Sequence, residues 1–418
     1  MTGTTYQFDS AGWPRPDTGL AVAAPVVAPA FTGEAPGVIV MGGDCGALGV
    51  ARSLGRRGVA VGFLPGPNRL ASYSRFTQTI PGWPGAESGN ALGWLEDYAH
   101  GAGAGGWVLI PAGDSEVRLV TDNHARLAPL FRLTTPPWDV TRFAGDKSLT
   151  YQRAAELGVA HPRTYRIADM AEAEAQAADL AYPVILKPAM KEGVNDLTAD
   201  KAWRADDSFE FLELFAAGLP LAGRGGLIVQ ELIPDDGTNQ FSYAAFFEAG
   251  EPRVVMTARR TRQKPRKAGT GTFVETLGSC PFEADAEKLL KSLDYTGLVE
   301  IEFMRDPRDG SYRLIDVNPR VWTWNALGLP AGVDFAWAVW EHANGRPVTR
   351  GRAAEGHSWI YGPRDMFSAM EDMRDGLLHF PEYLRQLSGA SCFATWALDD
   401  PLPFAADIPL SLRRILRR

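Results

Sequence analysis

Residues 296–320 read TGLVEIEFMRDPRDGSYRLIDVNPR, with two runs of strand-forming residues around the turn sequence DPRDG. Apolar residues recur in both runs, and the Pro and Gly between them interrupt regular structure, so the pattern predicts a β-hairpin. Because side chains alternate along a strand, Glu300 and Glu302 share one face, and Asp316 and Asn318 share a face of the partner strand. An antiparallel register that pairs Asp316 with either glutamate brings these side chains together.

Crowded carboxylates repel one another and raise one another's pKa unless a cation lies among them. Carboxylate and amide oxygens suit Mg²⁺, which usually binds one or two protein carboxylates and completes its octahedron with water and substrate phosphates. The segment Asn318-Pro319-Arg320 adds an amide and a guanidinium, and a guanidinium is the preferred partner of phosphate oxygens. The hairpin therefore indicates a site for a metal ion and phosphate. The alternative is a hydrated strand face whose charges act singly.

The composition is that of a soluble globular protein. The chain has 418 residues, of which 45% are hydrophobic and 22% charged, and this length favours two or three domains. A net charge of −8 argues against a general nucleic-acid binder, whose footprint is basic. The three cysteines lack metal-site spacing, and we recognise neither a secretory signal nor an integral membrane span, so we expect cytoplasmic residence.

The N-terminal third predicts an arm followed by a small α/β domain. Residues 1–36 are rich in Ala, Pro, Thr and Gly and predict a flexible arm. From Gly37 onward, strand, helix and strand patterns predict a βαβ unit, and residues 37–135 together predict a doubly wound domain. The glycines after the first strand do not match G-x-G-x-x-G, so a nicotinamide cofactor is a minor alternative. Two alternatives remain for this turn. It binds a substrate carboxylate at the N-terminus of the helix, or it only allows the strand and the helix to pack closely.

Two lysines stand in positions that suggest phosphate binding. Asp146 is a suitable cap for a helix over Lys147–Leu157 that ends at Gly158, and Lys147 projects from its first turn. Lys187 ends the apolar strand of YPVILKPAM, where burial is costly unless the ammonium meets a counter-charge. A lone surface lysine is usually hydrated, so the two together carry more weight than either alone.

In this order, the lysines and the acidic hairpin resemble the ATP-grasp superfamily. The resemblance implies an α/β protein, α+β in its nucleotide-binding part, with an ATP-grasp fold preceded by a doubly wound pre-grasp domain. It divides the remaining chain into an N-terminal or lid subdomain, a C-terminal subdomain with the metal site, and a C-terminal extension: residues 136–228, 229–350 and 351–418.

The resemblance also assigns roles at the hairpin. It implies that ATP is bound with Mg²⁺, with Mn²⁺ as the alternative ion, through Glu302, Asp316 and Asn318. Glu300 is a competing ligand, and Asp316 stands where glutamate is commoner in the family. Arg320 would stabilise the transferring phosphoryl group. Lys147 and Lys187 would contact the nucleotide phosphates.

The strand GLIVQELIP occupies the place of the family's adenine-binding hinge. The resemblance implies contacts to ATP from Gln230, Glu231 and Leu232, with Asp236 as a weaker candidate for the ribose. An ordinary apolar strand end is the alternative. Farther along, Trp322 and Trp324 are expected in the core or, because they lie near Arg320, along a substrate pocket.

Six basic residues lie between Arg259 and Lys267, followed by the flexible sequence GTGT. In an acidic protein, a basic patch before the metal hairpin favours binding of anionic substrate groups over a plain hydrated surface. The series from Arg259 and Arg262 to Gly269 resembles the carboxylate-amine ligase branch, which includes D-aspartate ligases. Arg259, Arg260 or Arg262 would bind the substrate carboxylate or its acyl phosphate.

The resemblance therefore implies an ATP-dependent carboxylate-amine ligase. It would convert a carboxylate into an acyl phosphate, form an amide or peptide-like bond with an amine, and release ADP. The partners expected are small-molecule carboxylate and amine substrates, which by family resemblance are amino acids, and a second copy of the chain in a homodimer. No nucleic-acid partner is expected. Two alternatives stay open: a carboxylase or carbamoyl-type enzyme, and a nucleotide-binding protein without catalysis. The identity of the substrates cannot be read from these residues.

Overall fold

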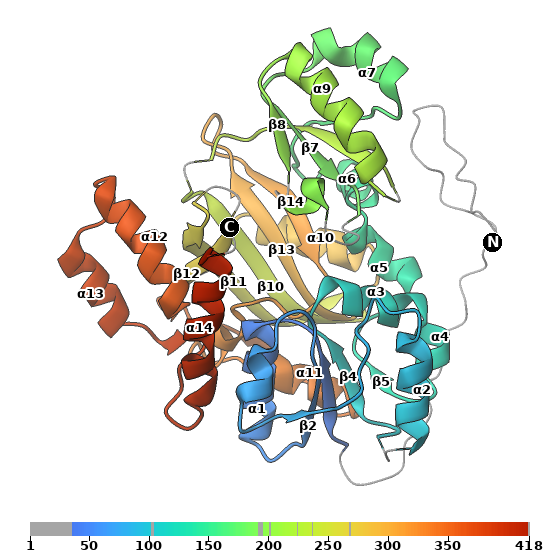
Figure 1. The fold of residues 1–418 in the computed structure, drawn as a ribbon, viewed down its shortest axis with the longest axis vertical. Coiled ribbons are helices and arrows are strands. Elements are labelled where there is room, and N and C mark those ends of the chain that lie inside the picture. Colours follow the sequence, from blue (N-terminus) through green and yellow to red (C-terminus); the bar gives the residue numbers. More distant parts are fainter. Residues whose placement is uncertain are drawn as a thin grey trace.

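The computed structural model describes residues 36–416 except 102–103, 191–194, 200–201, 224, 236 and 267–268. The expected arm of residues 1–36 lies almost wholly outside the described residues, and so do Asp236 and Lys267. Three β-sheets organise the described chain, and helices cover their faces (Figure 1). Among the described residues, no helix has both the length and the apolar character needed to cross a membrane.

The first sheet is parallel, with the strand order β3-β2-β1-β4-β5. Its strands are β1 (Val38–Met41), β2 (Val61–Leu64), β3 (Gln78–Thr79), β4 (Val108–Pro111) and β5 (Arg132–Leu133). The helices of this unit are α1 (Cys45–Gly55), α2 (Ala91–Gly101), α3 (Asp114–Asp122) and α4 (His124–Leu127), with the 3-10 helix η1 (Leu70–Tyr73). The strand order reverses between β1 and β4, so ligands are expected beyond the carboxyl ends of these strands. Helix α3 begins at this edge and faces the rest of the molecule (Figure 1).

The second sheet is antiparallel, with the order β6-β9-β7-β8. Its strands are β6 (Thr164–Tyr165), β7 (Val184–Pro188), β8 (Trp203–Ala205) and β9 (Leu227–Glu231). Helices α7 (Met170–Gln176) and α9 (Ser208–Gly218) cover one face, and α8 (Asp196–Ala199) and two short 3-10 helices, η2 (Ala177–Asp179) and η3 (Leu219–Leu221), complete the unit. The boundary expected between residues 228 and 229 falls inside β9. This strand stays with the second sheet because it pairs with β7 along its whole length.

The third sheet has the order β14-β13-β10-β11-β12-β16-β17, and β15 pairs with β11. Its strands are β10 (Gln240–Glu248), β11 (Glu251–Lys264), β12 (Thr270–Leu277), β13 (Gly297–Arg305), β14 (Tyr312–Asn318), β15 (Gly351–Arg352), β16 (Ser358–Ile360) and β17 (Cys392–Phe393). The associated helices are α10 (Glu283–Lys291), η4 (Asn325–Gly328), α11 (Phe335–Ala343), α12 (Gly362–Arg374), α13 (Phe380–Ser388) and α14 (Leu402–Leu416). Residues after 350 therefore add strands to this sheet as well as helices beside it.

The hairpin predicted over residues 296–320 is confirmed as β13 and β14. Its antiparallel register places Glu302 opposite Asp316 and Glu300 opposite Asn318, with an irregularity after Glu302. The apolar side chains of the opposite face, including Ile301, enter the core beneath the sheet. The acidic face of the hairpin therefore points toward the second sheet.

Helix α6 (Lys147–Leu157) has the predicted bounds, and α5 (Trp138–Gly145) precedes it. The Asp146 carboxylate accepts a hydrogen bond from the Ser148 amide at 2.9 Å, which is the expected N-terminal cap. Gly158 ends the helix in the left-handed conformation, with φ of 68°. The cap fixes Lys147 as the first helical residue, so its side chain projects toward the hairpin.

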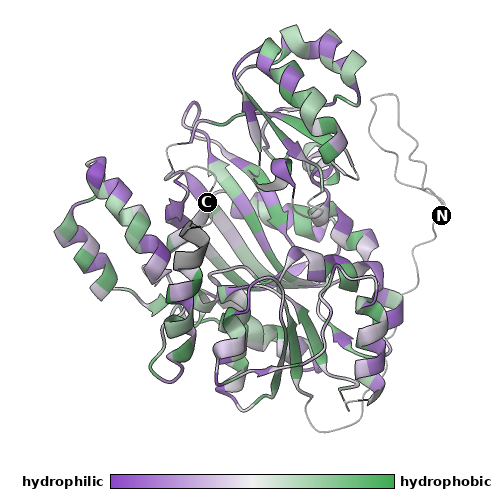
Figure 2. Ribbon diagram, viewed as in Figure 1, coloured by the Kyte–Doolittle hydropathy of each residue, from purple (hydrophilic) through white to green (hydrophobic). Residues whose placement is uncertain are grey.

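The hydrophobic core continues from the first sheet into the third. One cluster joins residues of β1 and α1 to residues of β10, β12 and α11. Trp322 is fully buried in this cluster and packs edge-on against Phe335. Figure 2 shows the strands of the first sheet as hydrophobic, while the helices around them alternate between polar and apolar residues. The first unit is therefore packed firmly on the sheet that carries the acidic hairpin.

Buried ion pairs attach the C-terminal helices to the rest of the chain. Arg262 on β11 donates to both carboxylate oxygens of Asp365 on α12, at 3.0 and 2.7 Å, and both side chains are buried. Arg52 on α1 similarly donates to Asp400 at 2.9 Å. Because an unpaired charge is costly in a buried position, each pair constrains the placement of the segment that supplies its acid.

We expect Asp365→Asn to lower the free energy of unfolding by about 3 kcal/mol or more, because Arg262 would keep its buried charge without a counter-ion. Asp399→Asn is the matched control, since Asp399 forms an exposed pair with Arg56 and its loss should cost about 0–1 kcal/mol. Urea unfolding followed by tryptophan fluorescence measures both. Equal losses in the two variants would contradict this assignment.

Candidate active site

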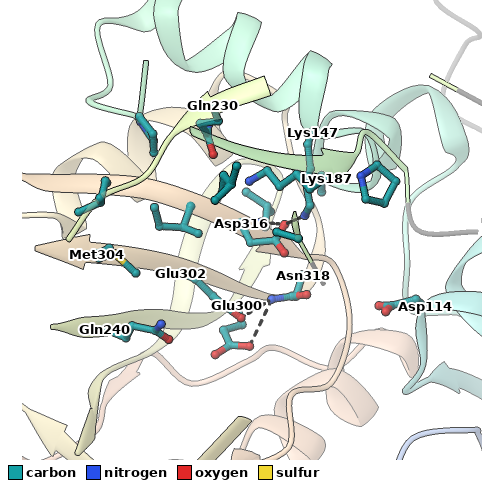
Figure 3. A pocket seen from close by; sticks show the side chains of 18 of the residues that line it. Asp114, Lys147, Lys187, Gln230, Gln240, Glu300, Glu302, Met304, Asp316 and Asn318 are labelled. Carbon is teal, nitrogen blue, oxygen red and sulfur yellow. Dashed lines mark hydrogen bonds and ion pairs between the residues drawn. The ribbon is translucent and has the colours of Figure 1, made fainter. Parts of the chain in front are cut away.

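A cleft of about 990 Å³ lies between the second and third sheets. Strands β7 and β9 line one wall, β13 and β14 line the other, and α3 and α5 close one end (Figure 3). The volume is at the upper end of the range for small-molecule sites, so the cleft has room for more than one small ligand. Lys147, Lys187, Gln230, Glu302, Asp316, Asn318 and Arg320 all line it, as do Glu231, Leu232 and Glu300.

The acidic face of the hairpin forms a compact polar group. Asn318 donates its amide to Glu302 at 3.1 Å, as the dashed line in Figure 3 marks. The Arg260 guanidinium lies 2.6 Å from Glu302 and 3.2 Å from Glu300. Glu300 also accepts a hydrogen bond from the Ser242 hydroxyl at 2.9 Å and is buried, whereas Glu302 is partly open. Glu302 is therefore better placed than Glu300 to contact a ligand in the cleft.

The charges in this group shift each other's proton affinity. Burial raises the pKa of Glu300, and the neighbouring Glu302 adds to this effect, while Arg260 opposes it. Burial alone would lower the pKa of the Arg260 guanidinium, but the two carboxylates raise it overall. Arg260 therefore remains a cation and offsets the acidic pair from beneath.

Lys147 and Asp316 form an ion pair across the cleft floor. Burial tends to lower the pKa of Lys147, and the adjacent Asp316 carboxylate outweighs that effect, so the net shift is upward. Asp316 also accepts the amide hydrogen of Val317 at 3.0 Å. The first residue of α6 is thus joined to the acidic hairpin 169 positions away in sequence.

Lys187 is more deeply buried than Lys147 and has a different partner. Its ammonium donates to the Tyr151 hydroxyl at 2.9 Å, a neutral group in place of the counter-charge that its strand position suggests. Burial, followed by repulsion from Lys147, lowers the pKa of Lys187 to about 7. An anion arriving beside Lys187 would favour its charged form, so the pocket is prepared for a phosphate or carboxylate.

Arg320 reaches the other end of the cleft. Its guanidinium is paired with Asp114, the first residue of α3, and donates to the Asn318 side-chain oxygen at 3.1 Å. Burial would lower the pKa of Arg320, but the Asp114 carboxylate raises it overall. Arg320 therefore connects the hairpin to the first unit of the chain, and sequence reasoning gave no signal for Asp114.

The hinge segment lies in the cleft wall, but its amides are partly used within the protein. The Glu231 amide donates to the Arg163 carbonyl at 2.9 Å, and the Leu232 amide donates to the Pro183 carbonyl at 3.0 Å. The Leu232 N–H is therefore used within the protein, although Leu232 itself lines the cleft. The next amide along the chain is that of Ile233, which also lines the cleft.

The side chains of the hinge are also engaged. Gln230 donates to the Thr164 hydroxyl at 2.9 Å. The Glu231 carboxylate pairs with Arg308 and Arg313, at 3.2 and 3.1 Å. Asp236, the ribose candidate, lies outside the described residues.

The structure does not place Arg259 or Arg262 along the cleft. Arg259 pairs with Glu275 at 3.2 Å on the opposite face of β11, and Arg262 is used in the buried pair with Asp365. Strand alternation separates Arg259 from Arg260, and an irregularity between residues 260 and 262 breaks the simple alternation beyond it. The expectation that Arg259 or Arg262 binds substrate in the cleft is therefore corrected; of the three arginines, Arg260 lines the cleft, where it pairs with Glu300 and Glu302.

The expected basic patch is largely neutralised. Lys264 pairs with Glu371 on α12, and Arg266 pairs with Asp372 at 2.6 Å. Each basic residue described between positions 259 and 266 thus has an acidic partner. The two tryptophans also separate: Trp322 belongs to the core, whereas Trp324 lines the cleft.

The donor set of the hairpin fits a hard divalent cation such as Mg²⁺. Glu302 and Asp316 are opposite one another in the register, and Asn318 contacts Glu302, so two carboxylates and an amide face the same space. Within the described residues, no three His, Cys, Asp or Glu side chains gather as a metal site.

Sequence comparison places residues 144–324 in the ATP-grasp domain family. A D-aspartate ligase of Enterococcus faecium is 24% identical over 226 residues, which cover 51% of this chain and 53% of that protein. The large chain of carbamoyl phosphate synthase from Methanobrevibacter smithii is 26% identical over 178 residues, covering 41% of this chain and 16% of that protein. The chain thus aligns with about half the length of the first relative and a small part of the second.

Structure comparison agrees on the fold. The biotin carboxylase domain of the Hydrogenobacter thermophilus 2-oxoglutarate carboxylase, in complex with MgADP, ADP and bicarbonate, superposes with a TM-score of 0.60. The match covers 77% of this chain and 73% of that chain, at 16% identity. The chain has an ATP-grasp fold, in agreement with the match of residues 144–324 to the ATP-grasp domain family.

We expect Lys187→Met to stabilise the ligand-free protein, and most strongly below about pH 7. The folded state binds the Lys187 proton less tightly than the unfolded chain, so wild-type stability rises as pH increases from about 7 toward 10.5. The advantage of the variant should therefore shrink by roughly 2 kcal/mol between about pH 7 and pH 9.

Unfolding free energies of the two proteins across this range provide the measurement. Lys291→Met is the matched control, because Lys291 is exposed and Glu251 raises its pKa, so it titrates above the window. An advantage for Lys187→Met that does not change with pH would show that Lys187 stays charged in the folded protein.

Proposed function

We propose that this protein is an ATP-dependent carboxylate-amine ligase. It converts a carboxylate into an acyl phosphate and joins it to an amine as an amide or peptide-like bond, releasing ADP and phosphate. The observation that carries the proposal is that Lys147, Lys187, Arg320 and the acidic face of the hairpin line a single cleft. The similarity to D-aspartate ligase supports the choice of reaction.

In this proposal the nucleotide lies between the second and third sheets. The purine rests against residues 230–233, which line the cleft wall. The phosphates extend toward Lys187 and Lys147. Binding would return Lys187 to its charged form and draw Lys147 away from Asp316, because each ammonium gains a phosphate partner.

Glu302, Asp316 and Asn318 would hold Mg²⁺, or Mn²⁺ as the alternative, at the phosphate end of the cleft. When bound, such an ion neutralises charge on the β- and γ-phosphate oxygens. Arg260 stays beneath Glu300 and Glu302 and holds the two carboxylates close together by pairing with both. Asn318 orients Glu302 through its amide, so this part of the site is preorganised by the β13–β14 register.

Arg320 is proposed to bind the transferring phosphoryl group and the acyl phosphate. Phosphoryl transfer asks the protein mainly for positioning and electrostatic stabilisation, and a guanidinium at the edge of the metal site supplies both. The side chain is held by Asn318 and the Val321 carbonyl, at 3.1 and 3.2 Å, which limits its movement. The Asp114 carboxylate is paired with the Arg320 guanidinium in this structure. It would have to share the guanidinium with the phosphoryl group or be displaced by it.

Bicarbonate remains a second candidate for the carboxylate substrate. The sequence match to a carbamoyl phosphate synthase large chain favours its inclusion, although the match covers 16% of that relative. Cytoplasmic residence and a homodimer also belong to the proposal and await direct measurement. A nucleotide-binding protein without catalysis would bind ATP but release no ADP with any carboxylate and amine.

We expect ADP release to require MgATP, a carboxylate and an amine together, and Glu302→Gln to reduce it about a hundredfold or more because a metal ligand is lost. Coupled ADP assays over a panel of carboxylates, including bicarbonate, and amino acids give the measurement. Glu251→Gln is the matched control, since Glu251 lies at an exposed turn of the same sheet and pairs with Lys291.

The control should keep wild-type turnover, and Glu302→Gln should still bind ATP in the absence of metal. Turnover that survives in Glu302→Gln would remove this carboxylate from the site. ATP binding without turnover across the whole panel would favour the non-catalytic alternative.

A further inference from the structure

Tyr151 is a buried side chain with no role in the chemistry proposed so far. It lies on α6 one helical turn after Lys147, so the two side chains project from the same face of the helix. Its ring packs against Ala189, which follows β7, and against Ile228 of β9. Its hydroxyl donates to the Ile315 carbonyl on β14 at 2.5 Å. Tyr151 therefore joins the two walls of the cleft, although it is not among the described residues that line it.

The Tyr151 hydroxyl acts as an acceptor toward Lys187. Burial raises the pKa of this hydroxyl well above its ordinary value, so the oxygen keeps its single proton. That proton is directed to the Ile315 carbonyl, which leaves the oxygen to accept a hydrogen bond from the Lys187 ammonium at 2.9 Å. The ammonium also lies 5.1 Å from the centre of the Tyr151 ring, a distance at which the ring attracts a cation. One side chain thus holds Lys187 through both its polar and its aromatic part.

This arrangement leaves Lys187 able to bind a phosphate. An ammonium has three N–H donors, and the hydrogen bond to Tyr151 uses one of them. Because Lys187 lines the cleft, the other donors are available to a ligand. A lysine side chain loses much rotamer freedom when it is fixed in one conformation. A lysine that the protein has already fixed loses less on binding, and its ligand is bound more tightly.

The hydrogen bond from Tyr151 to β14 lies beside the proposed metal ligands. Ile315 directly precedes Asp316, and Lys147, from the same face of α6 as Tyr151, pairs with the Asp316 carboxylate. Figure 3 shows Lys187 and Lys147 next to each other above Asp316. The chain of contacts from Ile315 through Tyr151 to Lys187 therefore fixes the position of the lysine relative to the metal-binding end of the hairpin.

We propose that Tyr151 is a positioning residue for Lys187, and that its hydroxyl fixes the lysine relative to the metal-binding end of β14 before the nucleotide arrives. This inference rests on the proposed ligase function, because that function assigns Lys187 to the nucleotide phosphates. Tyr151 acts through Lys187 and does not itself touch the nucleotide. Its ring contributes to packing, whereas its hydroxyl serves the phosphate site.

The test is a double-mutant cycle on MgADP binding, measured by calorimetry with the whole chain. Tyr151→Phe keeps the buried ring and removes the hydroxyl. We expect it to weaken MgADP binding about tenfold, because Lys187 loses its acceptor and has to be ordered by the ligand. In the Lys187→Met background the same substitution should change the affinity by less than about twofold, since its effect passes through the ammonium.

Tyr182→Phe is the matched control. The Tyr182 hydroxyl also donates to a backbone carbonyl, that of Ala177, at 2.8 Å, and Tyr182 is not among the described residues that line the cleft. This variant should bind MgADP as tightly as the wild-type protein.

The outcomes separate this inference from the proposed function. Wild-type affinity in Tyr151→Phe would overturn the inference. An equal loss of affinity in the wild-type and Lys187→Met backgrounds would overturn it as well, because the hydroxyl would then act on the fold in general. Both results would leave the proposed ligase function intact. A wild-type protein that binds no MgADP would instead contradict that function, and this inference with it.

Discussion

The antiparallel pairing of β13 with β14 is the constraint on which the site depends. It sets Glu302 opposite Asp316 and Glu300 opposite Asn318, and so concentrates negative charge on one face of a single hairpin. Such a face is stable only where cations offset it. Arg260 from the neighbouring part of the same sheet and Lys147 from α6 supply those charges in the ligand-free protein. Helix α6 is thereby held close to the hairpin.

The cations of the cleft interact with protein groups that an anionic ligand can replace. Lys147 is paired with Asp316 and Arg320 with Asp114, while Lys187 donates to the Tyr151 hydroxyl and has a pKa of about 7. Of the cations proposed to contact phosphate, Lys147 and Arg320 are each paired with a protein carboxylate. Lys187 has a lowered pKa and therefore loses its proton more readily than an exposed lysine. Anionic ligands would replace these internal partners, which offsets part of the cost of desolvating the ligand.

The C-terminal segment determines how the first unit meets this site. Asp400 binds Arg52 of α1, and Asp365 binds Arg262 of β11, so buried ion pairs tie the segment to the first unit and to the third sheet. The continuous core between α1 and α11 acts in the same direction. With these attachments in place, α3 faces the cleft and Asp114 reaches Arg320. The C-terminal segment, although distant in sequence from the residues of the cleft, therefore helps to position α3 and Asp114 at the end of the cleft.

The sequence by itself determined the local elements: the hairpin from its alternation and turn, and α6 from the Asp146 cap and Gly158. It also predicted the fold class and most of the lysines, acids and amide that line the cleft, because their positions follow from strand and helix ends. Strand alternation separates Arg259 from Arg260, but only the tertiary structure decided that Arg260 faces the site while Arg262 does not, since irregular pairing after Arg260 in β11 breaks the alternation. It also decided that the Leu232 amide is used by Pro183 and that Asp114 meets Arg320 across 206 positions, because contacts between distant segments leave no periodic trace in the chain.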